Sequence, residues 1–182
     1  MICLQETWCS DNYDNSHLNI EGFNLHLLNR GNGKGVANYF KTGFELTGEV
    51  NTELFQMTKF SNSDCHIVNV YRSQGANDSL FNEHLNTLIV GCQNCFVVGD
   101  FNINGMNNRM HPVIQSLISS EFRQLVDTPT HESGSLLDYA FVKTNLNYGT
   151  DLHWPYYSDH AAVYIGELKS TEEIQAIYDS TS

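Results

Sequence analysis

Short apolar runs, several with alternating polar positions, dominate the chain and predict a domain built mainly of strands. We expect strands over residues 2–4, 23–27, 35–41, 53–60, 65–71, 95–98, 136–142 and 161–168. The segments 53–60 and 65–71 are joined by the turn-forming residues 61–64, which predicts a hairpin.

Two segments have helical spacing instead. Asn77–Ser79 offers N-cap residues to a helix whose apolar face is formed by Phe81, Leu85, Leu88 and Ile89. Pro112 is suited to open a second helix, with a stripe made of Ile114, Leu117, Ile118, Phe122 and Leu125. Paired strands with helices between them predict a layered α/β domain with mixed sheets.

The 182 residues suit one domain over 1–168, followed by an acidic, polar tail over 169–182. Hydrophobic residues make up 41% of the chain, an ordinary globular composition, and no apolar run is long enough to span a bilayer. The net charge of -12 is unlike that of most nucleic-acid binders and predicts weak non-specific affinity for a polyanion.

Five cysteines and the lack of a secretory signal predict a reduced, intracellular protein, nuclear or cytoplasmic and not secreted. Cys92 and Cys95 have the spacing of a zinc half-site, but the other cysteines form no second pair. The alternative interpretation is two small buried thiols that lead into the strand at 95–98.

The candidate chemistry lies in four polar motifs that end or interrupt apolar runs: Gln5–Thr7, Gly99–Asn102, Leu137–Tyr139 and Ser158–His160. Each contains an acid. If the fold gathers these motifs at one edge, it assembles the oxygen ligands that hold a divalent metal against a phosphate and activate water. Taken singly, each motif is also explained as a turn or as an exposed strand end.

Residues two apart on an extended chain point the same way, so Asp100 and Asn102 are expected to face one site while Phe101 enters the core. A carboxylate can take a proton from water, and an amide can orient that water. Asp138 lies within an apolar run and therefore needs a partner, for which His160 is the best candidate. A purely structural pair is the alternative.

Other polar side chains are candidates for contact with phosphate. Tyr71 and Arg72 end one predicted strand, and both can donate to phosphate oxygens. Arg30 and Lys34 belong to a glycine-rich turn that does not match a phosphate-binding loop, so we expect them to touch a substrate backbone at most.

In their order along the chain, these motifs resemble the endonuclease/exonuclease/phosphatase superfamily, most of all the abasic-site-like endonuclease domain of LINE-type retrotransposons. Pro129–His131, followed by Leu137 and Asp138, also fits the retroelement branch. The resemblance implies a four-layered αββα sandwich and Mg2+-dependent hydrolysis of DNA phosphodiesters, with Mn2+ as the alternative metal. It also implies a protein without membrane contact, either a monomer or part of a larger retroelement polyprotein.

The resemblance also implies roles for individual residues. Glu6 would bind the metal. Asp159 would either bind the metal directly or contact a group that does. Asp100 would activate water, and Tyr71 would contact phosphate. The remaining roles would fall to Asn102, which positions water and phosphate, and to Asp138, which orients His160 toward the charge that develops on phosphorus.

One departure from the family concerns the first strand, which usually ends in an Asn beside the metal-binding Glu. Here Met1 lies where the strand of Glu6 is already running. We therefore expect the fold to be retained, with lowered stability and impaired activity. The alternatives to a DNA-nicking enzyme are a phosphatase or phosphodiesterase acting on a nucleotide, RNA end or lipid, and an inactive remnant that serves as a binding module.

Overall fold

The computed structural model of the chain describes residues 1–9, 15–29 and 34–169. Strand-forming segments dominate it, as the alternating pattern predicts. The elements in chain order are β1 (Ile2–Gln5), a 3-10 turn (Asn15–Leu18), β2 (Asn24–Asn29), β3 (Gly35–Phe40), β4 (Glu45–Asn51), β5 (Phe55–Ser61), β6 (His66–Arg72), α1 (Asp78–Ile89), β7 (Cys95–Asp100), α2 (Pro112–Ser119), β8 (Arg123–Gln124), β9 (Asp138–Lys143), β10 (Tyr148–His153) and β11 (Ala162–Glu167).

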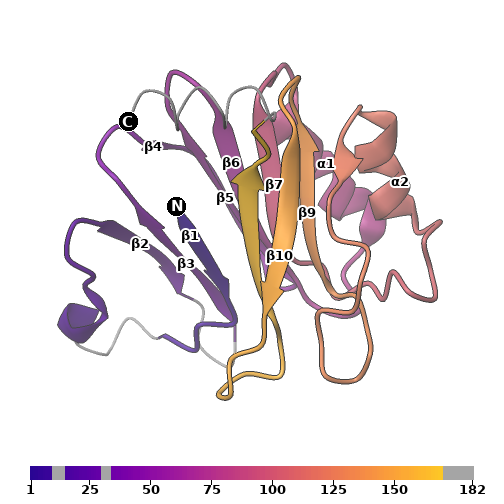
Figure 1. The fold of residues 1–182 in the computed structure, drawn as a ribbon, viewed down its shortest axis with the longest axis horizontal. Coiled ribbons are helices and arrows are strands. Elements are labelled where there is room, and N and C mark those ends of the chain that lie inside the picture. Colours follow the sequence, from indigo (N-terminus) through magenta and orange to yellow (C-terminus); the bar gives the residue numbers. More distant parts are fainter. Residues whose placement is uncertain (10–14, 30–33, 170–182) are drawn as a thin grey trace, which may run out of the picture.

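The strands form a mixed six-stranded sheet in the order β4-β5-β6-β7-β9-β8, an antiparallel sheet β1-β3-β2 and a hairpin β10-β11. Within the large sheet β6 and β7 are parallel, and the other pairs are antiparallel. Figure 1 shows the two helices beyond one side of the large sheet and β1 to β3 on the other side. The predicted sandwich is confirmed, although only the large sheet is mixed and both α-helices of the described residues lie on one side of it (Figure 1).

The main core lies between the large sheet and the helices. Asn77 caps α1 by accepting a hydrogen bond from the Leu80 amide at 3.0 Å, and the predicted apolar face of this helix is buried. Phe81 from α1 packs edge-on against Phe101, with ring centroids 5.9 Å apart. The helices therefore cover one face of the sheet whose strands β7 and β9 carry Asp100 and Asp138 at their ends.

The predicted hairpin over 53–60 and 65–71 is also confirmed, because β5 and β6 are antiparallel neighbours. Asn62 closes the turn, and its side-chain oxygen accepts hydrogen bonds from the amides of Asp64 and Cys65 at 2.9 and 2.8 Å. Cys92 and Cys95 are free, buried thiols. Among the described residues, neither thiol belongs to a group of side chains close enough to share a metal ion.

The helix predicted from Pro112 is shorter than its apolar stripe suggests. It ends at Ser119, and Glu121 has a φ of 68°, which an α-helix cannot contain. Phe122 and Leu125 therefore lie beyond the helix, and the Leu125 amide donates to the carbonyl of Ala140 on β9 at 2.8 Å. Phe122 and Leu125 continue the apolar spacing of the helix because the extended segment after it also packs against the core.

Three strands have no counterpart among the predicted ones: β4, β10 and the two-residue β8, which lies where the helical stripe was expected to continue. β4 and β10 are half-exposed and polar, so their alternation of apolar residues is weak. Conversely, the strand predicted over 136–142 begins at Asp138, because the amides of Leu137 and Asp138 both donate to the Thr130 side chain. Within the described residues no helix has the length and apolar character needed to cross a membrane.

Buried amide side chains join the two main sheets. Gln5 on β1 donates to the Asn69 side chain at 2.6 Å, and Asn69 donates to the Asn38 side chain at 2.9 Å. Asn38 and Asn69 are both fully buried. Because unpaired buried amides are costly, these bonds fix the facing register of β1, β3 and β6.

We predict that Asn69→Val lowers the free energy of unfolding by about 1–3 kcal/mol, because it leaves the Gln5 and Asn38 amides without this partner. Urea denaturation measures the change. Thr58 is the matched control: it lies opposite Asn69 on β5, and within the described residues its buried hydroxyl has no hydrogen-bond partner. Thr58→Val should cost less than about 0.5 kcal/mol; an equal loss in both variants would contradict a role for the amide bonds.

Candidate active site

Strand register brings three of the predicted site residues side by side. Tyr71 on β6 lies opposite Asp100 on β7, and Asp100 lies opposite Asp138 on β9. We call these three residues the strand-end row. Because they occupy matching positions on neighbouring strands, a phenol and two carboxyl groups meet at one edge of the large sheet.

Backbone conformation sets the position of the middle member of the row. Gly99 has a φ of 136°, and a Cβ atom there would lie 1.9 Å from the carbonyl oxygen of Val70. Glycine thus permits the close approach of β7 to β6 just before Asp100. Phe101 is buried, as predicted, while Asn102 turns back toward Asp100 with a φ of 50°.

Asn102 holds both oxygens of the Asp100 carboxyl group. Its amide N–H donates to Oδ1 and its side-chain Nδ2 donates to Oδ2, each at 2.8 Å. The same Nδ2 donates to the Arg72 carbonyl at 2.9 Å. The predicted pairing of an acid and an amide at one site is therefore confirmed in geometry.

The environment of Asp100 disfavours its ionised form. Burial, followed by the negative charge of Asp138, raises the pKa of Asp100 to about 7, against smaller opposing effects of Asn102 and His160. A carboxyl group with a pKa near neutrality can both accept and release a proton at ordinary pH. Asp100 is therefore a candidate for a general base.

His160 is the predicted partner of Asp138, and the structure confirms the pairing. Nδ1 of His160 lies 2.8 Å from Oδ2 of Asp138. The hydrogen bond to Asp138 is the main reason that the pKa of His160 rises to about 9, so the ring is an imidazolium at neutral pH. Among the described residues Nε2 has no hydrogen-bond partner, which leaves its proton available to an anion.

Glu6 follows β1 directly and has a φ of 50°, so the chain turns sharply there. Its Oε1 accepts a hydrogen bond of 2.8 Å from the Tyr71 hydroxyl. Burial, and then the bond to Glu6, raises the pKa of the Tyr71 phenol above its usual range, so the phenol stays a neutral donor. The structure thus joins the end of β1 to the strand-end row.

His131 was not among the predicted site residues. Its Nε2 lies 3.2 Å from Oδ2 of Asp159, and its ring stands edge-on to His160 with centroids 4.8 Å apart. A backbone bridge between His131 and His160 makes this contact. The two residues are far apart in the sequence, and nothing in their spacing indicates the contact, although His131 belongs to the Pro129–His131 motif.

Arg72 does not face the strand-end row, contrary to expectation. It is buried, and its guanidinium donates to the carbonyls of Phe101 and Ala76 and pairs with Asp78 at 2.6 Å. Tyr71 and Arg72 are consecutive on β6, so their side chains point to opposite faces. Both cannot reach one phosphate, and Arg72 instead anchors the start of α1.

Of the two cations of the glycine-rich turn, Lys34 lies within the described residues. Lys34 donates to the Glu53 carbonyl at 2.5 Å, which ties its ammonium group to the loop before β5. Arg30 lies outside the described residues. Contact of either residue with a substrate backbone stays a prediction.

The donor set of the site fits a hard divalent cation. Asp138 and Glu6 both contribute to the raised pKa of Asp100, so the carboxyl groups of this edge repel one another. A bound cation would offset this repulsion, and carboxylate and amide oxygens are the ligands that Mg2+ and Mn2+ take. Asp159 belongs to a neighbouring group with His131 and His160 whose ligand atoms lie within 4.8 Å of one another.

Comparison with known proteins gives one sequence match and several structural ones. The profile described as "Endonuclease/Exonuclease/phosphatase family" matches residues 1–160. No curated protein matches the sequence significantly.

The similar solved structures are distant in sequence, so their likeness concerns the fold. The endonuclease domain of TRAS1, a telomere-specific non-LTR retrotransposon, has a TM-score of 0.62 at 15% identity, covering 80% of this chain and 78% of that one. The Haemophilus ducreyi cytolethal distending toxin has a TM-score of 0.61 at 15% identity, covering 92% and 84%. The 3' phosphatase NExo from Neisseria, bound to a product DNA hairpin, has a TM-score of 0.61 at 13% identity, covering 92% and 88%.

The shifted pKa values predict how stability varies with pH in metal-free protein. The pKa of His160 is raised because the folded protein favours the protonated ring. This preference stabilises the fold fully below pH 6.5, and the stabilisation is lost as pH rises through about 9. The raised pKa of Asp100 acts in the same direction at lower pH: its penalty is absent below pH 3.8 and complete above about 7. The free energy of unfolding should therefore fall as pH rises across both windows.

Urea denaturation in EDTA over a pH series measures these two windows separately. His160→Gln should flatten the upper window, a change on the order of 2 kcal/mol, and Asp100→Asn should flatten the lower one. His153→Gln, at the exposed end of β10, is the control. A steep fall that persists above pH 7 in His160→Gln would contradict the assignment.

Proposed function

The chain belongs to the endonuclease/exonuclease/phosphatase family, and from that membership and the geometry of the strand-end row we propose that it is a divalent-metal-dependent endonuclease of retroelement origin that nicks DNA. The observation that carries the proposal is the Asp138–His160 pair beside Asp100, with bonds of 2.8 Å fixing both the imidazole and the neighbouring carboxyl group. These contacts support the assignment of a proton acceptor and a cationic donor to this edge. In-line hydrolysis of a phosphodiester needs both.

The roles of the protein's own residues follow from their contacts. Asp100 takes the proton of the attacking water, and Asn102 holds that carboxyl group in place through two hydrogen bonds. The His160 imidazolium, oriented by Asp138, donates from Nε2 to the phosphate oxygen on which negative charge develops. The bond from phosphorus to the leaving oxygen breaks as the bond to the water oxygen forms, the leaving oxygen takes a proton from solvent, and no covalent intermediate with the enzyme is needed.

Glu6 and Asp159 are the residues that would hold a divalent cation in this proposal. Tyr71 fixes Glu6 by donating to its Oε1. A bound Mg2+ or Mn2+ would supply Lewis-acid stabilisation of the phosphate and would neutralise part of the acidic cluster. Direct contact of Tyr71 with phosphate would require its hydroxyl to leave Glu6.

A phosphatase or phosphodiesterase acting on a nucleotide, RNA end or lipid is the second candidate. The net charge of -12 favours this second candidate. A small phosphoester, unlike DNA, has no phosphate backbone that must be bound by a basic surface. Both activities use the same residues at the scissile phosphate. They differ in product: a nicked strand in one case and free phosphate in the other.

We predict that Asp100→Asn and His160→Ala each lower the rate of Mg2+-dependent plasmid nicking by about 10²–10⁴-fold, because one removes the base and the other the cationic donor. Conversion of supercoiled plasmid to the nicked form measures the rate. Asp64→Asn, in the exposed β5–β6 turn, is the control for loss of a carboxylate and should nick at the wild-type rate.

The same preparations are tested for release of free phosphate from small phosphoesters. Phosphate release without nicking would favour the second candidate. Nicking that survives in both variants would contradict the site, and a wild-type protein without metal-dependent hydrolysis would favour the interpretation as a binding module.

A further inference from the structure

An open groove adjoins the candidate active site. Its volume is about 650 Å³, and it is lined by Pro129, His131, Glu132, Gly134 and Trp154. The His131 ring forms part of the groove and stands edge-on to His160, with centroids 4.8 Å apart. The groove therefore begins one side chain away from the imidazole assigned to the phosphate.

The segments that form the groove are tied together by their backbones. The Glu132 amide donates to the Asp159 carbonyl at 2.9 Å, and the Ala161 amide donates to the Thr130 carbonyl at 2.7 Å. These bonds flank the bridge between His131 and His160. The base of the groove is therefore ordered before a ligand binds, so binding costs little conformational entropy of the protein.

Charge decides which part of a nucleotide the groove can take. Its lining contains a glutamate and no lysine or arginine. In a chain with a net charge of -12, a lining with one glutamate, one histidine and no lysine or arginine offers little attraction for phosphate. The groove suits a neutral, planar group that can also donate hydrogen bonds to a carboxylate.

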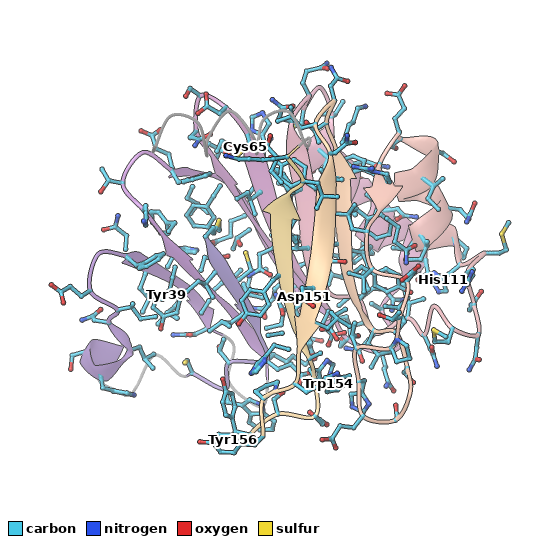
Figure 2. The ribbon with its side chains drawn as sticks, viewed as in Figure 1. Tyr39, Cys65, His111, Asp151, Trp154 and Tyr156 are labelled. Carbon is cyan, nitrogen blue, oxygen red and sulfur yellow. The ribbon has the colours of Figure 1, made fainter. Side chains whose placement is uncertain are left out.

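Aromatic side chains supply a surface for such a group. Trp154 is 46% exposed, and beyond it Tyr156 and Tyr157 are 100% and 80% exposed, with ring centroids 5.3 Å apart. Figure 2 shows Trp154 and Tyr156 projecting together at the end of the molecule to which β10 points. Exposed aromatic rings beside a site serve in other proteins as platforms on which nucleobases stack, and stacking needs no basic surface.

Resting on the proposed function, we propose that this groove binds an unpaired nucleobase of the strand whose phosphate lies at His160, stacked on Trp154. A base within an intact duplex must first be unpaired and unstacked, at a free-energy cost that a base in a single strand does not incur. The Glu132 carboxylate accepts hydrogen bonds from exocyclic amino groups, which cytosine has and thymine lacks. The preferred substrate is therefore DNA with unpaired, amino-bearing bases beside the scissile phosphate.

The test measures binding of fluorescein-labelled 12-mers by anisotropy in EDTA, where hydrolysis is absent. The wild-type protein should bind single-stranded oligo-dC more tightly than a duplex of the same length. Trp154→Ala should weaken single-strand binding roughly fivefold to hundredfold, the range for loss of one stacked base. Tyr164→Ala removes a 59% exposed aromatic ring of β11 that does not line the groove, and it should leave binding unchanged.

The Glu132→Gln variant tests the base preference independently of stacking. The wild-type protein should bind oligo-dC more tightly than oligo-dT, and this difference should shrink in Glu132→Gln, because a carboxamide can also donate to thymine. Equal affinity of the wild-type protein for dC and dT would overturn the role of Glu132. Unchanged binding in Trp154→Ala, or duplex bound as tightly as single strand, would overturn the groove as a base site.

A third set of measurements separates a lipid surface from a nucleobase as the occupant. Sedimentation with phosphatidylcholine vesicles should show no Trp154-dependent binding; such binding without oligonucleotide affinity would overturn the proposal. Failure of the proposed function is distinguishable from failure of the groove. Trp154-dependent binding without Mg2+-dependent nicking would contradict the nuclease and support the base site. Mg2+-dependent nicking with binding that does not depend on Trp154 would support the nuclease and contradict the base site.

Discussion

The parallel pairing of β6 with β7 is the constraint on which the site depends. Parallel neighbours need a crossover, and α1 supplies it, capped by Asn77 and packed through Phe81 against the sheet. The crossover returns the chain in a register that sets Asp100 opposite Tyr71. Gly99 then allows the strands to approach closely at that point. A shift of one residue would turn the Asp100 side chain to the helix-covered face and dissolve the strand-end row.

The same register concentrates negative charge. Carboxyl groups from β7, β9 and the end of β1 meet where burial weakens their solvation. Hydrogen bonds from Asn102 and from the His160 imidazolium offset part of the cost. Burial and the charge of Asp138 still raise the pKa of Asp100, and a bound cation would balance part of the remaining negative charge. Stability and chemistry are therefore set by the same few contacts.

Much of this arrangement follows from the sequence because the cost of a buried acid is a strong signal. Asp138 lies in an apolar run, which indicated a partner, and His160 is that partner. The role of Arg72 could not be inferred in the same way, because a strand end alone does not tell which face a side chain takes. It lies buried against Asp78, at the start of the crossover helix.

Other features depend on contacts between distant segments. His131 reaches the site through a backbone bridge to His160, and no local pattern indicates which segment crosses there. β4 and β10 are half-exposed strands whose polar sequences carry little alternation. The groove beside Trp154 likewise exists because two loops are tied together by their backbones. The positions of the acids therefore follow from the sequence, whereas the groove beside Trp154 depends on contacts that no local pattern indicates.

Burial, and then the negative charge of Asp138, raises the pKa of Asp100 in the metal-free protein, and a bound cation would lower that pKa again. Carbon-13 NMR titration of the Asp100 carboxyl group, with and without Mg2+, tests it most directly. The account predicts titration near pH 7 in the metal-free protein and a clear fall in that pKa when Mg2+ is added. An Asp100 carboxyl group that titrates near its ordinary value, or whose pKa ignores Mg2+, would contradict the account.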